Sequence, residues 1–175
     1  AQMELFARDT DIKGTVTSHS ANKSSSGKEA QNVQHFRSDR NKTETFTASN
    51  INASESLTLN NSGSLNLSAA NINAGALTAS ATGNINSNAV KTTNRTESDH
   101  TQSKGLWYNN NLSSSADESL HQTKINAGSV NIATTGKVQL DATELNSAAD
   151  ARIAAQQGIV LSSNSETDSS STYVS

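Results

Sequence analysis

Residues 72–87 read INAGALTASATGNINS, and residues 125–140 read INAGSVNIATTGKVQL. Residues 51–67 and 145–161 follow the same formula with single-residue gaps. The formula is Ile or Leu, Asn, Ala or Ser, an apolar-x-apolar pair, three spacer residues, a Gly slot and a second apolar-x-apolar pair. In the last copy Gln157 stands closer to the Gly slot than Gly158 does. The chain therefore contains an internal repeat of about 20 residues, which is the sequence signature of a repeat architecture.

The apolar residues of each repeat alternate with Asn, Thr, Ser or Gln, as at Leu57/Leu59 and Val138/Leu140. A period of two is typical of a strand with one buried face. So short a pair of strands cannot bury that face alone, and each repeat needs the next one stacked on it. We therefore predict an all-β fold, a β-solenoid with three strands of about three to five residues in each coil.

Stacking of the repeats predicts which residues meet. Equivalent residues of successive coils should pair as parallel strands. The expected interior pairs are Ile51/Ile72, Ile125/Leu145, Leu57/Leu77 and Val130/Ala151.

Two positions of the repeat, one occupied by Asn and the other by Gly, are expected at corners of the coil. The first holds Asn, which tolerates left-handed backbone angles and can form a ladder of stacked amides. The second holds Gly and is expected to need positive φ. The residues concerned are Asn52, Asn73, Asn126 and Asn146 for the first slot, and Gly63, Gly83 and Gly136 for the second.

The repeats are interrupted. We expect one β-helix segment over 1–175, with regular coils at about 1–17, 48–87 and 124–161. Between and after them lie Ser- and Thr-rich segments, here called excursions, at about 18–47, 88–123 and 162–175. A structureless loop of some 30 residues is unusual in a compact domain. The excursions are therefore predicted to be extended β-arms or hairpins.

Two alternatives, another β fold and a disordered chain, fit the sequence less well than the solenoid. An antiparallel sandwich of short strands is disfavoured by the 20-residue period and by the absence of Asn-Gly and Asp-Gly turns. Intrinsic disorder is disfavoured by the regular periodicity and by a charged fraction of only 17%.

Composition excludes several kinds of function. The chain has no Cys, which removes disulfides, thiol catalysis and thiolate metal sites. Its net charge of −3 comes from interspersed signs, so no basic face for nucleic acid is expected. No apolar run exceeds three residues, which excludes a transmembrane helix and a signal-peptide core. The start AQMELF predicts a piece of a longer protein.

No catalytic, cofactor or metal site is predicted. The pairs Asp9/Asp11 and Asp117/Glu118 are expected to be solvated, although Asp9 and Asp11 could share one strand face. Asp150 and Arg152 are expected on the surface as well. The four His residues show no metal-type spacing and are expected to be exposed; they are His19, His35, His100 and His121.

The most unusual local feature is Leu106-Trp107-Tyr108, which follows Lys104-Gly105 and precedes three Asn residues. Aromatic side chains exposed at the end of an excursion are typical of contact sites for a partner, a glycan or a membrane interface. The alternative is that Trp107 packs into a small core beneath the excursion. We name Leu106, Trp107 and Tyr108 as the candidate contact site.

The INAG-x-V/L-x-I pattern with its following Gly-x-Val-x-Leu resembles the haemagglutinin repeats of filamentous-haemagglutinin-like exoproteins. The Ser/Thr-rich breaks with Ser103 to Trp107 resemble the second, more C-terminal repeat class of that family, which occurs in contact-dependent growth-inhibition effectors. The resemblance implies a right-handed parallel β-helix. It also implies secretion by a Gram-negative bacterium through an outer-membrane transporter, the two-partner secretion route.

The function implied by this resemblance is a stalk and interaction segment on the cell surface. It would support adhesion, or delivery of a C-terminal toxin through contact with a target cell's outer membrane, as a virulence factor. Self-association through the open ends of the solenoid is expected too. The alternatives are a β-helix carbohydrate-active enzyme or polysaccharide-binding tail-type protein, and an autotransporter stalk.

Overall fold

The computed structural model describes residues 1–28 and 32–174 of the 175-residue chain. The described residues form strands and their connections without an α-helix, so the all-β prediction is confirmed. They divide into two compact units. The first unit comprises 1–15, 46–90 and 120–165, and the second comprises 16–45, 91–119 and 166–175.

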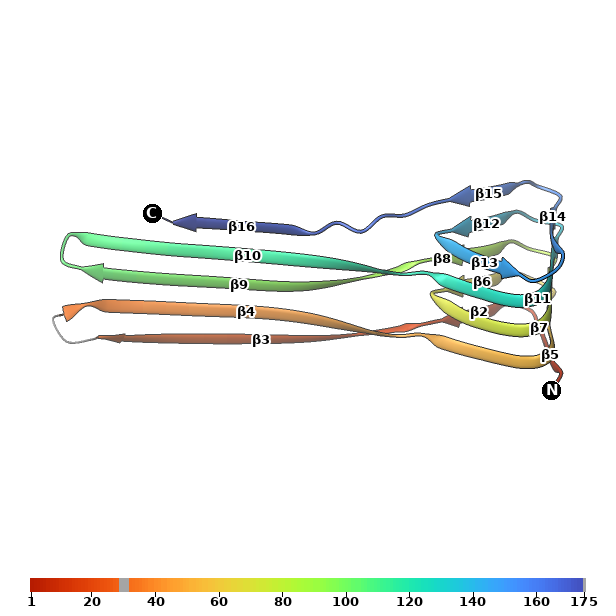
Figure 1. The fold of residues 1–175 in the computed structure, drawn as a ribbon, viewed down its shortest axis with the longest axis horizontal. Helices are drawn as coiled ribbons and strands as arrows, with labels where there is room; N and C mark the ends of the chain where they lie inside the picture. Colours follow the sequence, from red (N-terminus) through yellow and green to blue (C-terminus); the bar gives the residue numbers. More distant parts are fainter. Residues whose placement is uncertain (29–31, 175) are drawn as a thin grey trace. The chain divides into compact units, whose positions relative to one another are not determined.

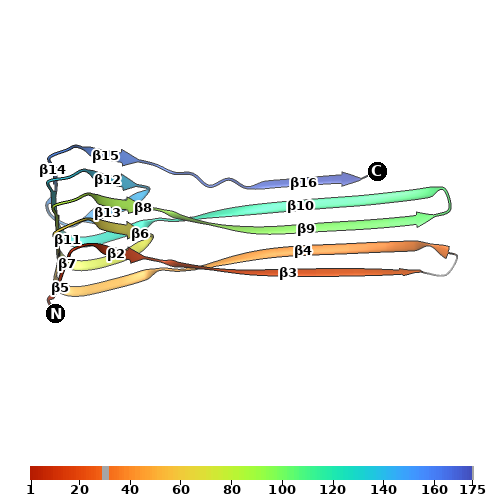
Figure 2. The same cartoon turned by 180° about the vertical axis from the view of Figure 1, so that it is seen from behind.

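The first unit contains two parallel sheets (Figure 1). One runs in the order β1 (Met3–Ala7), β5 (Ser49–Asn61), β7 (Ala70–Ala81), β11 (Thr123–Thr134) and β13 (Thr143–Ser147), with β14 (Ala151–Ala155) also paired to β11. The other, visible from behind in Figure 2, runs in the order β15 (Ile159–Ser162), β12 (Val138–Asp141), β8 (Ile85–Asn88), β6 (Leu65–Ser68) and β2 (Thr10–Lys13).

Each full repeat consists of one long strand and one strand of four residues. The prediction of three short strands in each coil is wrong for β5, β7 and β11, which have 12 or 13 residues. The first two predicted strands run together because the bend between them keeps the backbone paired, with one register shift between Ala53 and Ser56. In the last repeat they are separate, as β13 and β14.

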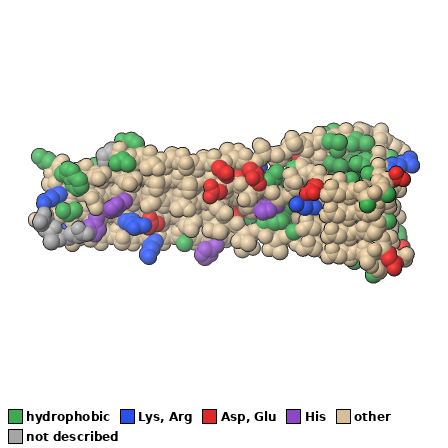
Figure 3. Space-filling model, in the orientation of Figure 1, with side chains coloured by type: hydrophobic (Ala, Val, Ile, Leu, Met, Phe, Trp, Pro, Cys, Tyr) green, Lys and Arg blue, Asp and Glu red, His purple; other side chains and the backbone are tan. Residues whose placement is uncertain are grey.

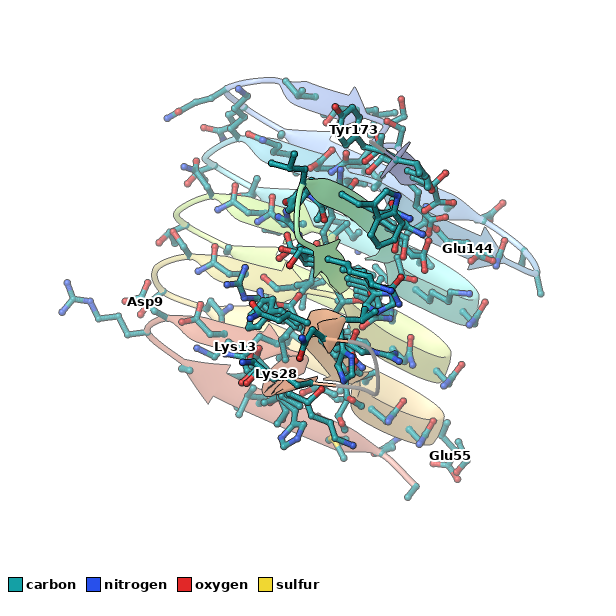
Figure 4. All side chains as sticks on the ribbon, turned by 90° about the vertical axis from the view of Figure 1, so that its left-hand side faces the viewer. Asp9, Lys13, Lys28, Glu55, Glu144 and Tyr173 are labelled. Atoms are coloured by element: carbon teal, nitrogen blue, oxygen red, sulfur yellow. The ribbon has the colours of Figure 1, made fainter. Side chains whose placement is uncertain are left out.

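The predicted residue pairs are confirmed by the strand register, but Ala151 is exposed and is therefore not the interior residue that was expected. Ile51 pairs with Ile72, which pairs in turn with Ile125, and Ile125 pairs with Leu145. A second column follows from the same pairings and consists of Leu57, Leu77, Val130 and Ala151. Figure 4 shows these repeats as stacked layers, with Glu55 and Glu144 projecting outward.

The core of the first unit lies between its two sheets. Leu57 and Leu59 of β5 and Leu65 of β6 are at most 1% exposed and belong to the same apolar cluster. Full burial of each such side chain stabilises the fold by about 1.5–3 kcal/mol. Polar residues interrupt the core, and they are bonded: the Ser87 and Thr143 hydroxyls lie 2.6 Å apart, and the Thr10 hydroxyl donates to Asn61 Oδ1 at 2.9 Å.

The Gly slot of the repeat has a different cause from the predicted one. Gly63, Gly83 and Gly136 do not have positive φ, so that expectation is wrong. A Cβ on Gly83 would lie 2.9 Å from the carbonyl oxygen of Gly63, and one on Gly136 would press on the carbonyl oxygen of Gly83. Close approach of successive backbones therefore excludes a side chain. Gln157 takes the slot in the last repeat, and its N–H donates to the Gly136 carbonyl at 3.0 Å.

Left-handed backbone occurs instead where one repeat passes into the next. Ala69 and Ala142 have φ of 50° and 44°. Gly14 and Ala89 occupy the same slot, since Gly14 N–H donates to the Ser68 carbonyl and Ala69 N–H to the Asn88 carbonyl. Neither has positive φ. After Gly14 and after Ala89 the chain continues into a long strand of the second unit and not into the next repeat.

The second unit is one sheet in the order β16 (Ser169–Val174), β10 (Trp107–His121), β9 (Val90–Lys104), β4 (Gln34–Thr47) and β3 (Thr15–Lys28). The ends of β3, β4, β9 and β10 belong to the first unit. The β4/β9 and β10/β16 pairings are antiparallel. In the described residues the first two excursions are thus paired strands, as predicted.

Candidate functional site

The candidate contact site lies at the turn between β9 and β10. β9 ends at Lys104, Gly105 and Leu106 form the turn, and β10 begins at Trp107. Gly105 has φ of 59°, which glycine adopts without steric cost at the first central position of a type II′ hairpin turn. No atom would contact a Cβ on Gly105, so its φ is what favours glycine at this position.

All three predicted contact residues are exposed. Leu106 is 108% exposed, Trp107 52% and Tyr108 58%. Trp107 therefore does not form the buried cluster that was the alternative. Trp107 and Tyr108 are consecutive in a strand, so their side chains point to opposite faces of the sheet. An aromatic ring is thus presented on each face.

Further apolar side chains lie exposed in the same sheet and were not predicted. Leu112 of β10 pairs with Tyr173 of β16, and Asn111 pairs with Val174. Leu112, Tyr173 and Val174 are between 44% and 64% exposed, and Phe36 of β4 is 44% exposed. Figure 3 shows green hydrophobic side chains gathered toward the end of the second unit where Figure 1 draws the β9–β10 turn. The pairing of Tyr173 and Val174 with residues of β10 could not be predicted without the strand register.

The sheet that carries these residues is a single layer within its own unit. β3 is exposed at all 14 of its residues. Among the described residues of this unit no hydrophobic side chain is fully buried, so backbone pairing and polar contacts hold the sheet together. In one such contact the Glu44 carboxylate accepts the Thr93 N–H at 2.8 Å and lies 2.7 Å from the Lys42 ammonium.

Two carboxylates of this sheet have shifted pKa values. The Lys42 side chain, and then the Thr93 N–H, lower the pKa of Glu44. Hydrogen bonds from Ser98 and then Arg37 lower the pKa of Asp39. Both carboxylates are held charged by partners within the sheet, so they support the scaffold of the contact site.

A second candidate surface is the ladder of Asn side chains on the first unit. Nδ2 of Asn73 donates to Asn52 at 2.9 Å, Asn126 to Asn73 at 3.2 Å and Asn146 to Asn126 at 2.9 Å. The predicted ladder is therefore confirmed. These Asn residues lie in strands and none has positive φ, so the left-handed backbone that Asn tolerates does not occur there.

A shallow groove of about 840 Å³ runs along this ladder. Its lining includes the four Asn residues and the small residues that follow them, among them Ala74, Gly75, Ala127 and Gly128. Each ladder bond uses one of the two Nδ2 hydrogens of its Asn donor. Amide groups facing an open groove can bind hydroxyl groups.

The carboxylate pairs noted in the sequence have structural partners. Asp9 lies before β2 and accepts the Ser64 N–H at 2.8 Å, whereas Asp11 lies in β2 and accepts from Asn66 Nδ2 at 2.7 Å. They do not share a strand. Glu118 lies 3.3 Å from the Lys91 ammonium, and Asp117 is exposed. Asp150 and Arg152 are exposed, as expected.

The histidines are only partly as predicted. His19 and His100 are exposed, but His35 and His121 are half-buried, and the ring of Phe46 stacks on His121. Within residues 1–28 and 32–174, no three His, Asp or Glu side chains form a group that could hold a metal ion. The same residues contain no helix that is long and apolar enough to cross a membrane.

Comparisons of the chain with protein-family models, with curated proteins and with solved structures found no match. The fold and the exposed residues define an all-β protein with two parallel sheets and a separate antiparallel sheet. That antiparallel sheet presents aromatic side chains at a hairpin turn.

Proposed function

We propose that the first unit is a segment of a right-handed parallel β-helix with one coil for each sequence repeat, and that the antiparallel strands are extended excursions from it. The in-register column Ile51–Ile72–Ile125–Leu145 supports this proposal. The ladder of Asn amides supports it as well, since each amide lies one repeat from the next.

The proposed function is a stalk and interaction segment of a secreted filamentous exoprotein on the surface of a Gram-negative bacterium. It would support adhesion, or delivery of a C-terminal toxin to neighbouring bacteria, through contact with the target outer membrane. An outer-membrane secretion transporter would be the partner of the full-length protein, and no enzymatic activity or nucleic-acid binding is proposed.

The observation that carries this proposal is the exposure of Leu106, Trp107 and Tyr108 on a hairpin. Trp and Tyr are enriched where apolar and aqueous phases meet, because their rings are apolar and carry a polar N–H or O–H. The pairing of β9 with β10 fixes the backbone that carries the rings before contact, which reduces the entropy lost on binding.

Binding of the chain to vesicles made from outer-membrane lipids tests the contact. The variant Trp107→Ser/Tyr108→Ser should bind at least about tenfold more weakly, a loss of about 1.4 kcal/mol. Phe6→Ser is the matched control, since Phe6 is an aromatic residue 66% exposed in the first unit, and it should bind like the parent chain. Equal binding of all three proteins contradicts membrane contact by these residues.

A deletion in the full-length protein tests the function itself. Removing Val90–Gln122 joins Ala89 to Thr123, and this restores the spacing found at Ala69–Ala70, because Lys124 pairs with Asn71. Adhesion or toxin transfer should be lost while the protein still reaches the cell surface. Unchanged activity removes the hairpin from the mechanism.

The groove beside the Asn ladder favours a second candidate, a polysaccharide-binding protein of the tail type. Its amides could bind sugar hydroxyls along several repeats. A binding and cleavage screen on neutral and anionic polysaccharides distinguishes the candidates. Binding that is lost in Asn126→Ala but kept in Trp107→Ser/Tyr108→Ser favours the groove, and cleavage would favour a carbohydrate-active enzyme.

A further inference from the structure

Three cationic side chains gather on one face of the second unit, where β4 pairs with β9. Lys42 of β4 pairs directly with Arg95 of β9, and Arg40 pairs with Glu97. Residues paired in this way lie side by side on one face of the sheet, and like charges between them are destabilising. The pairing of Lys42 with Arg95 is therefore unfavourable for the fold by itself. Departures of this kind from the local rules are expected at functional sites.

Two carboxylates hold these cations in place without neutralising all of them. Glu97 is shared by two guanidinium groups, since it contacts Arg95 and lies 3.6 Å from Arg40. Glu44 lies 2.7 Å from the Lys42 ammonium. The two carboxylate side chains are 27% and 15% exposed, whereas the three cationic side chains are between 48% and 66% exposed. The excess positive charge is therefore at the surface.

A cavity of about 260 Å³ opens among these side chains. Its charged lining consists of the three cations and Glu97, so three positive charges and one negative charge leave +2. Ser20 and Asn22 of β3 add a hydroxyl and an amide group to the lining. A phosphate monoester carries about −1.5 to −2 charges at pH 7 and three strong acceptor oxygens. We propose that this cavity is a binding site for a phosphate group, held by guanidinium and ammonium groups.

The same face carries exposed apolar side chains nearer the β9–β10 turn. Phe36 stands an even number of residues from the cationic residues of β4, so it points to their face. It pairs with Thr101, whose hydroxyl donates to Asn110 Oδ1 at 3.3 Å. β10 therefore presents Asn110 to this face, and with it Tyr108 two residues earlier. Trp107 points to the opposite face.

Apolar side chains beside a phosphate site fit a phosphate-bearing lipid at a membrane surface. Aromatic side chains occupy the boundary between acyl chains and headgroups, and Lys and Arg near this boundary attract anionic headgroups. The lipid as the source of the phosphate rests on the membrane contact proposed above, whereas the phosphate site itself does not. The sheet then lies with the face of Tyr108 on the membrane.

Inorganic phosphate tests the site without a membrane. Nitrogen NMR of the guanidinium groups should show shifts at Arg40 and Arg95 that saturate as phosphate is added, and no such shift at Arg37. Arg37 is the matched control, because it also lies in β4 and is paired with a carboxylate, that of Asp39, but points to the opposite face. Equal shifts at the three arginines, or no shift at any of them, overturn the phosphate site.

Vesicles test the lipid. The parent chain should bind vesicles of phosphatidylcholine with phosphatidic acid about tenfold more tightly than vesicles of phosphatidylcholine alone. The variant Lys42→Gln/Arg95→Gln should lose this preference. The control Lys23→Gln/Arg37→Gln removes the same charge from the opposite face, where both cations line a cavity with Asp39, and it should keep the preference. Equal losses in the two variants would indicate attraction by overall charge and overturn the proposal.

The outcomes separate the site from the membrane contact. A response to inorganic phosphate without a preference for phosphatidic acid assigns the site to free phosphate and overturns the lipid as its source. A preference for phosphatidic acid that persists in Lys42→Gln/Arg95→Gln leaves the membrane contact intact and overturns the phosphate site. Tyr108→Ser should weaken vesicle binding more than Trp107→Ser, because only Tyr108 shares the face of the site. Circular dichroism confirms that each variant is folded.

Discussion

The ring of Phe46 stacks on the imidazole of His121, with ring centroids 4.1 Å apart and planes inclined by 15°. Phe46 also lies so close to Gly14 that a Cβ on this glycine would overlap the ring. A single aromatic ring thus connects β4, β10 and the residue that follows β2. The ring therefore contacts two other points of the chain, and at all three points the chain enters or leaves the repeats of the first unit.

The stack should be measurable as a coupling energy. A double-mutant cycle with Phe46→Ala and His121→Ala should give about 0.5–1.5 kcal/mol, the usual value for an aromatic pair. Urea unfolding at neutral pH gives the free energies of unfolding of the parent chain, the two single variants and the double variant. Additive effects of the two substitutions would show that the rings do not stabilise each other.

The left-handed residue at Ala142 should distinguish this corner from its counterpart at Ala89. Ala142→Val should cost about 2 kcal/mol, because a β-branched residue is strained at positive φ. Ala89→Val, in the same slot without positive φ, should cost less than half as much. Equal losses in denaturant unfolding would contradict backbone strain as the cause.

The Gly slot should be intolerant inside the stack and tolerant at its end. Gly136→Ala should destabilise the chain by about 1–3 kcal/mol, because its Cβ presses on the Gly83 carbonyl oxygen. Gln157→Ala is the matched control in the same column, and it should stay within about 0.5 kcal/mol of the parent. Thermal unfolding of both variants gives the comparison.

The Asn ladder should contribute to stability. Asn73→Ala removes one donated and one accepted amide bond and should cost about 1–2 kcal/mol. Thr78→Ala, an exposed change in the same strand, should cost no more than about 0.5 kcal/mol. Similar losses in the two variants would mean that the ladder bonds add nothing beyond strand propensity.

Acid should weaken the fold. The pKa values of Glu44, Asp39 and Glu144 are lowered in the folded chain; for Glu144, Asn146 and then Lys124 are the causes. The unfolded chain therefore binds protons first as pH falls, so the stability from these groups is present above their ordinary pKa and is lost below it. Urea midpoints should fall as pH drops below about 4.5, and Glu44→Gln should flatten this dependence. A urea midpoint that rises on acidification would contradict the predicted direction of the pH dependence.

The stacking could be predicted from the sequence because two independent signals agree. The alternation of Leu57/Leu59 identifies the buried face, and the regular spacing of the repeats identifies the partner in the next repeat. Together they predict the pairs Ile51/Ile72 and Leu57/Leu77, and the pairing of β5 with β7 confirms both. The Asn ladder follows from the same spacing.

The backbone geometry could not be predicted in this way. A Gly is compatible with positive φ and with close backbone approach, and only the structure shows that Gly83 has the second role. Left-handed backbone at Ala69 and Ala142 has no sequence signal, since alanine does not favour it. At the candidate site, Trp107 and Tyr108 could be found from composition. Their companion Tyr173 depends on the pairing of β16 with the distant strand β10, which no local pattern specifies.

Ile72 pairs with Ile51 of the repeat before it and with Ile125 of the repeat after it, and the two pairings have the same register. The strands β9 and β10, which lie between Ile72 and Ile125 in the chain, leave no phase error in the repeats. A hairpin at this point can therefore be lengthened, shortened or removed without a compensating change in the pairing of the neighbouring repeats. The stability of the stacked repeats is thereby separated from the sequence of the hairpin, so the two parts of the chain can change independently.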